Sequence, residues 1–97
     1  MTLLTNEIIA ELPEFYSTEE IPLEEKIVIC KFFTPDSDWT WFVFEGEPIE
    51  QAATLPKDYR FFGMAHGFAH EAGYFILSEL ESARGPLGMK IERDSSV

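Results

Sequence analysis

The sequence predicts one α+β domain with an N-terminal helix, a mostly antiparallel sheet of about four strands, and a short helix near residues 79–84. Four segments rich in β-branched and aromatic residues are separated by clusters of Gly, Pro, Asp and Ser. This alternation is typical of strands joined by turns. Helical patterns stand near the two ends of the chain. With 97 residues, residues 1–97 have room for a single hydrophobic core.

The first helix is predicted from the segment TNEIIAEL. Thr5 is a favoured N-cap residue, and Glu7 suits the positive end of the helix dipole. Ile8 and Leu12 fall on one helical face, and Pro13 ends the regular spacing. The following PEFYSTEEIPLEE is predicted to be an irregular acidic connection with one further helical turn.

The first two strands are predicted at residues 26–33 and 39–45. KIVICKFF is rich in β-branched residues and is bounded by the turn cluster TPDSD. The short spacing before the next strand favours an antiparallel hairpin. Alternate side chains of a strand point to opposite faces, so one face receives Trp39, Trp41 and Val43, and the other receives Thr40, Phe42 and Phe44. Because both faces are apolar, we expect this strand to be central.

A polar connection precedes the third and fourth strands, which are predicted from RFFGMAHGFA and GYFIL with HEA between them. The next helix is predicted at residues 79–84, because Ser78 and Glu81 have the spacing of a capping box. Gly85 stands where a helix ends at a C′ glycine. The tail is expected to lay three apolar side chains against the sheet: Leu87, Met89 and Ile91.

The formal net charge is −11, and it is unevenly distributed. Residues 1–25 hold seven glutamates and no Lys or Arg. Phosphate contacts need clustered basic residues, so we expect no direct binding of nucleic acid. Two interpretations stay open for the acidic surface: a docking surface for a basic protein, or a solvated face that aids solubility.

The longest apolar stretches span four to six residues, far fewer than the roughly 20 that cross a bilayer. The N-terminus has no basic region followed by an apolar one. We therefore expect a cytoplasmic protein without membrane association. Cys30, the single cysteine, lies in an apolar strand and is expected to pack in the core.

His66, His70 and Glu71 are the one group that resembles a metal site, because histidines four apart share a helical face. Gly63 and Gly67 interrupt the segment, and its aromatic residues favour strands. We therefore predict no metal site, no cofactor and no catalytic residues.

Seven residues are candidates for an interaction site. The aromatic side chains among them either fill the core or form a surface for a partner. The carboxylates flank Ser37 in a hairpin loop, where Asp is favoured for turn geometry and where an acid–base pair or a cation site is the alternative. The arginine either lines a groove or stabilises a helix C-terminus. These candidates are Trp39, Trp41, Phe42, Phe44, Asp36, Asp38 and Arg84.

The blocks FFTPDSDWTW, GYFILSELESARGPLG and IERD resemble those of a small bacterial family classified as a domain of unknown function. The resemblance covers nearly the whole chain. It implies a genomic setting on plasmids, integrative elements and phages, near conjugation and anti-restriction genes. It implies no catalytic or binding residues.

Two classes of function follow from these observations. The first is a non-catalytic accessory protein that binds a protein partner or forms a homodimer. Within this class lies a decoy of DNA charge that blocks a defence nuclease or a DNA-binding protein. The second is a small enzyme that uses carboxylates or histidines. A decoy needs carboxylates along one extended face, whereas an enzyme needs a pocket of converging polar groups.

Overall fold

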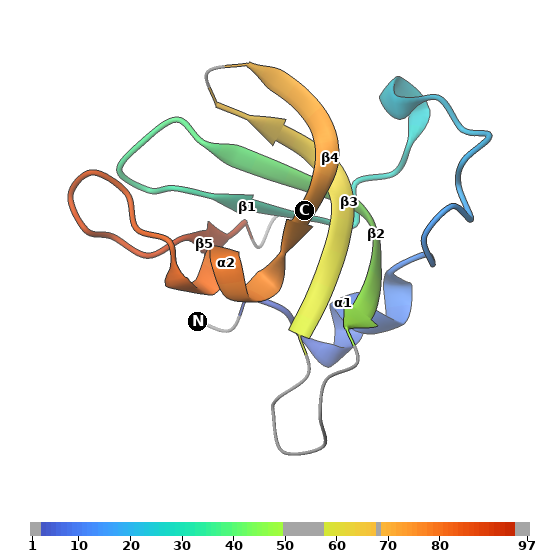
Figure 1. The fold of residues 1–97 in the computed structure, drawn as a ribbon, viewed down its shortest axis with the longest axis horizontal. Helices are drawn as coiled ribbons and strands as arrows, with labels where there is room; N and C mark the ends of the chain where they lie inside the picture. The colour runs from blue at the N-terminus through green and yellow to red at the C-terminus, as the bar shows by residue number, and fades with distance from the viewer. Residues whose placement is uncertain (1–2, 50–57, 68, 95–97) are drawn as a thin grey trace.

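The computed structural model describes residues 3–49, 58–67 and 69–94. It has an α+β fold with a five-stranded antiparallel sheet in the order β4-β3-β2-β1-β5 (Figure 1). The described elements are α1 (Asn6–Glu11), the 3₁₀ helix η1 (Leu23–Glu25), β1 (Cys30–Phe33), β2 (Thr40–Ile49), β3 (Asp58–His66), β4 (His70–Ile76), α2 (Leu77–Ser82) and β5 (Glu92–Arg93). The predicted fold class is confirmed, and β2 has a strand on each side, as its two apolar faces predict.

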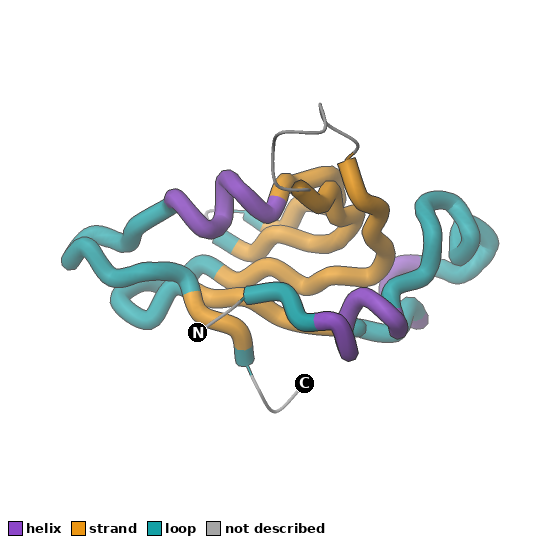
Figure 2. The backbone as a smooth tube through the Cα atoms, turned by 90° about the horizontal axis from the view of Figure 1, so that it is seen from below, coloured by secondary structure: helices purple, strands orange, loops and turns teal. Residues whose placement is uncertain are grey.

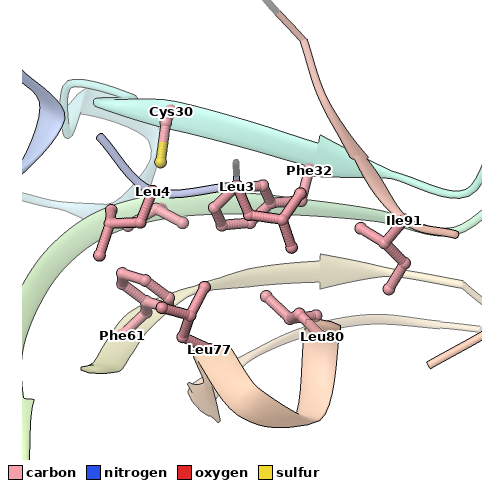
Figure 3. Packing of buried hydrophobic residues seen from close by; sticks show 9 residues of the cluster. Leu3, Leu4, Cys30, Phe32, Phe61, Leu77, Leu80 and Ile91 are labelled. Carbon is pink, nitrogen blue, oxygen red and sulfur yellow. The ribbon is translucent and has the colours of Figure 1, made fainter. Parts of the chain in front are cut away.

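The hydrophobic core lies on one face of the sheet. The N-terminal segment, α2 and Ile91 cover this face, and Figure 3 shows their side chains gathered with those of β1 and β3. Burial of apolar area is the main favourable term in folding, at roughly 25 cal/mol per Å². The buried hydrophobic residues of this cluster are Leu3, Leu4, Cys30, Phe32, Val43, Phe61, Leu77, Leu80 and Ile91. Cys30 is therefore in the core, as expected.

A β-bulge in β2 changes which side chains face the core. Val43 pairs with Gly63, and Glu45 pairs with Phe62, so the register between β2 and β3 shifts by one residue. In a regular strand, Val43 and Glu45 would share a face. The extra residue puts Glu45 on the face opposite the core, beside Phe62.

The N-terminal helix begins as predicted. Thr5 is the N-cap, and its hydroxyl accepts a hydrogen bond from the Ile8 amide at 3.2 Å. Within the described residues, the model contains no helix with the length and apolar character needed to cross a membrane.

The second helix differs from the prediction at both ends. It spans Leu77–Ser82, and Ile76 occupies the N-cap without a side-chain bond, so the predicted capping box is wrong. The Ser78 amide instead donates to the Asp58 carboxylate at 3.0 Å. Asp58 is the first residue of β3, which lies beside β4, the strand that leads into α2. A carboxylate distant in sequence therefore takes the place of the predicted local cap.

The strand boundaries also shift. β1 begins at Cys30 rather than at residue 26, and β2 continues to Ile49 because the bulge preserves pairing with β3. HEA belongs to β4, and the turn lies at Gly67, whose amide donates to the Ala69 carbonyl at 3.1 Å. Most of the polar connection lies outside the described residues. In the tail, Ile91 is buried whereas Leu87 is 80% exposed, so the expectation for Leu87 and Met89 is wrong.

Candidate functional site

The predicted site residues do not form one site. Trp39 and Trp41 stack with their ring centroids 5.9 Å apart. Together with Arg84 they line a cavity of about 280 Å³ beside Ala83 and Pro86. The other two aromatic candidates, which are Phe42 and Phe44, lie apart from this cavity.

Asp36 lies in the loop between β1 and β2 and joins this loop to the turn that follows α2. Its Oδ2 accepts hydrogen bonds from the amides of Leu87 at 2.8 Å and Met89 at 3.3 Å. A Cβ atom on Gly85 would lie 1.6 Å from Asp36 Oδ1, so only glycine permits this approach. The carboxylate thus fixes the turn after α2.

The remaining charged candidates lie at the same end. Asp38 is exposed and lines a separate hollow with Lys31 and Asp94. The Arg84 guanidinium donates to the carbonyl oxygens of Glu81 at 3.0 Å and Ala83 at 2.7 Å. These carbonyls belong to the last turn of α2 and the residue that follows it, where a cation is stabilising.

The two histidines lie directly opposite each other on β3 and β4. Their rings stack with centroids 3.8 Å apart, and the Phe42 ring lies 5.0 Å from His66. Burial, and then the charge of His70, lower the pKa of His66. Glu71 lines a hollow with Trp41 rather than with the histidines. Across the described part of the chain, no three His, Cys, Asp or Glu side chains gather as metal ligands.

A second site lies over the sheet face opposite the core, and we call residues 13–29 the acidic segment. The segment docks on Glu45, whose side chain is buried although the residue is charged. Its carboxylate accepts hydrogen bonds from the Tyr16 amide at 2.9 Å, from the Thr18 amide at 3.2 Å, and from the Thr18 hydroxyl. Glu47 accepts one more from the Phe15 amide at 3.2 Å.

Lys26 completes this polar anchor. Its ammonium lies 3.9 Å from Glu45 Oε2, and both side chains are almost fully buried. It also donates to the carbonyl and the hydroxyl of Thr18. A buried charge pair is tolerated only when hydrogen bonds satisfy the remaining polar atoms, and these bonds do so.

Between the acidic segment and the sheet lies a cavity of about 360 Å³, which we call the segment cavity. Tyr16 and Tyr74 stand at its rim with 65% and 53% of their surfaces exposed, and their hydroxyls are 3.4 Å apart. Tyr16 has a φ of +67°, a conformation that costs energy for a residue with a side chain. The lining residues are Tyr16, Glu19, Ile21, Pro22, Leu23, Lys26, Glu45, Phe62 and Tyr74.

Acidic side chains are exposed along α1 and the acidic segment. All seven glutamates of residues 1–25 are exposed, whereas Glu45 and Glu47 hold the segment in place. Sequence reasoning missed this cavity because the bulge that turns Glu45 towards the acidic segment has no signal in the local sequence pattern. The available signal was the aromatic pair Phe15 and Tyr16 within an otherwise polar connection.

A family model for a protein of unknown function, DUF2958, matches residues 3–97. No curated protein and no solved structure matches the chain. The family match extends from the N-terminal segment through the sheet and α2 to the end of the chain, so it covers both cavities. The resemblance found in the sequence is therefore confirmed, and the chain belongs to the family described as Protein of unknown function (DUF2958).

Proposed function

We propose that this protein is a non-catalytic accessory factor that binds another protein through the acidic segment and the segment cavity. The observation that carries the proposal is the exposure of large apolar side chains around that cavity, while a separate core stabilises the fold. Four of them line the cavity and are exposed: Tyr16, Ile21, Leu23 and Tyr74. Grouped exposed apolar side chains rimmed by charge are typical of protein-binding surfaces.

The charge around the cavity favours a basic partner. Glutamates flank the apolar side chains on the same segment, and Lys26 is engaged by Glu45 and Thr18. Opposite charge accelerates association and excludes acidic competitors. The mobile-element setting implied by the family resemblance is compatible with a partner encoded by the element or by its host.

The anchor on Glu45 supports the proposal in a second way. A segment of 17 residues without regular strands would lose much conformational entropy if it were ordered only on binding. The bonds from Tyr16 and Thr18 to Glu45 fix it beforehand. A preorganised surface of this kind binds more tightly than a disordered one of equal area.

The test is capture from the native host with the full chain as bait. Tyr74→Ala removes one rim side chain, and Leu87→Ser is the matched control because Leu87 is exposed at the other end. We expect the native bait and the control to retain one partner at low salt, and the Tyr74→Ala bait to lose it. Equal capture by all three baits, or loss with the control alone, would contradict the proposal. Light scattering decides whether the partner is a second copy.

A second candidate is a decoy of DNA charge, and the exposure of all seven N-terminal glutamates favours it. A decoy acts through its carboxylates, whereas the first proposal needs the apolar cavity. Glu19→Gln with Glu20→Gln should then release a DNA-binding partner, and Tyr74→Ala should leave it bound. The direct measurement is a competition assay that tests whether this protein displaces DNA from that partner.

A further inference from the structure

We infer that the segment cavity receives a cationic side chain of the partner, an arginine or a lysine, between aromatic walls. The inference rests on the proposed function and names the chemistry that the cavity recognises. It depends on the kinds of groups that line the cavity, their charge, and the size of the space.

Aromatic rings form much of the wall. The ring centroids of Phe62 and Tyr74 are 5.4 Å apart with their planes inclined at 54°. Tyr16 is tied to Tyr74 by the contact between their hydroxyls. The faces of such rings carry negative potential and attract a cation within roughly 6 Å of the centroid. Three aromatic side chains around one space thus offer contacts to a cation as well as to an apolar group.

The charged groups of the cavity have a negative balance. Glu19 and Glu45 oppose Lys26 alone among the lining residues. The Lys26 ammonium is held by Glu45 and Thr18, so it is directed into the anchor. The hydrogen bond with Tyr16 raises the pKa of Tyr74, the charge of Glu45 contributes in the same direction, and the charge of Arg60 opposes the shift. The charged lining residues therefore have a net charge of −1, which Glu19 supplies because Glu45 is paired with Lys26.

The same sheet face already holds two cations on aromatic rings. The Arg60 guanidinium carbon lies 5.5 Å from the centroid of Phe15, and the Lys31 ammonium lies 5.6 Å from that of Phe42. Phe15 in turn contacts Tyr74 at 5.4 Å between centroids. The neighbouring aromatic side chains thus accept basic groups of the chain itself, and the segment cavity is the position that a partner can fill.

The space is large enough to hold an arginine or lysine side chain. A volume of about 360 Å³ is near the lower limit of pockets for small ligands, which hold roughly 300–1,000 Å³. An arginine or lysine also has an aliphatic stem, and Ile21 and Leu23 offer apolar contact for it.

The test is a binding titration with short capped peptides followed by NMR. One peptide has a central arginine between leucines and a lysine towards each end, and its counterparts have citrulline or norleucine in the centre. Citrulline keeps the shape of arginine without its charge. We expect the arginine peptide to bind about tenfold more tightly than either counterpart, which is the gain expected from a partly desolvated cation–π contact. The largest changes in NMR chemical shift should occur at Tyr16, Phe62 and Tyr74.

Variants of the wall make the result specific. Tyr74→Phe keeps the ring and should keep the preference for arginine, whereas Tyr74→Leu should abolish it, and Leu87→Ser should have no effect. Equal binding of all three peptides would overturn the inference and leave the proposed function standing. Absence of binding by every peptide up to millimolar concentration would also overturn it. The proposed function falls separately, if the native host yields no partner that depends on Tyr74.

Discussion

Replacement of Glu45 by alanine should release the acidic segment from the sheet. The change leaves the amides of Tyr16 and Thr18 without their acceptor, and it leaves the Lys26 ammonium without a carboxylate. Loss of one member of a buried pair costs about 3–5 kcal/mol, and each unpaired buried amide costs about 1–3 kcal/mol. The segment lies at the surface and can lift into water, so the sum is an upper bound.

We therefore expect Glu45→Ala to lower the free energy of unfolding by about 3 kcal/mol, near the lower end of the cost of breaking a buried pair. The free energy of unfolding of a typical domain is only about 5–15 kcal/mol, so this loss would be a large part of it. Urea unfolding followed by tryptophan fluorescence measures the loss. Hydrogen exchange at the Tyr16 and Thr18 amides measures release of the segment, and protection there should fall more than at Val43 in β2.

Glu47→Ala is the matched control, because Glu47 accepts one hydrogen bond from the segment at 3.2 Å. Its cost should be about 1 kcal/mol. The double change Lys26→Met with Glu45→Leu should recover part of the loss, since no charge is then left buried alone. If Glu45→Ala cost no more than the control and left both amides protected, the anchoring role of Glu45 would be refuted.

Four further outcomes are expected. Asp36→Ala should cost about 1–3 kcal/mol in urea unfolding because two amides lose their acceptor, and Gly85→Ala should also destabilise because its Cβ would lie 1.6 Å from the Asp36 carboxylate. The pKa of His66 is below its ordinary value of 6.5, so the unfolded chain binds the proton first. The contribution of neutral His66 to stability is full above pH 6.5 and is lost as the pH falls below that value. The free energy of unfolding should therefore differ less between pH 5 and pH 7.5 for His66→Gln than for the native chain. Burial raises the pKa of Cys30 to about 12, so a thiol reagent at pH 8 should label Cys30 only in urea, and labelling of the folded protein would contradict its burial.

The elements that could be predicted from the sequence depend on local chemistry. Thr5 caps α1 through an amide three residues ahead, and the alternation of Trp41, Phe42 and Val43 assigns their faces because no irregularity interrupts the strand there. β5 could not be predicted, since two residues at Glu92–Arg93 carry no strand pattern and gain their pairing from β1.

The candidate site was harder to predict because its causes are distant in the chain. Asp58 caps α2 from the start of β3, and no pattern near Ser78 announces it. The bulge after Val43 is fixed by pairing with β3 rather than by a glycine at the bulge, so alternation misplaces Glu45. A charged residue in an apolar strand was the visible sign that the regular pattern ends there.

The two ends of the molecule differ in how their apolar side chains are used. At one end the chain supplies its own contacts: Trp41 packs against the core, and a Cβ on Gly67 would lie 2.4 Å from the Trp39 ring. At the other end, the acidic segment forms loops beside the sheet (Figure 2). Hydrogen bonds to Glu45 hold this segment in place, while Tyr16 and Tyr74 stay exposed. The Tyr16 φ of +67° shows a backbone held away from its preferred conformation. A buried carboxylate thus orders the acidic segment while Tyr16 and Tyr74 stay exposed beside it, and this arrangement is our reason for proposing a binding function at the acidic end.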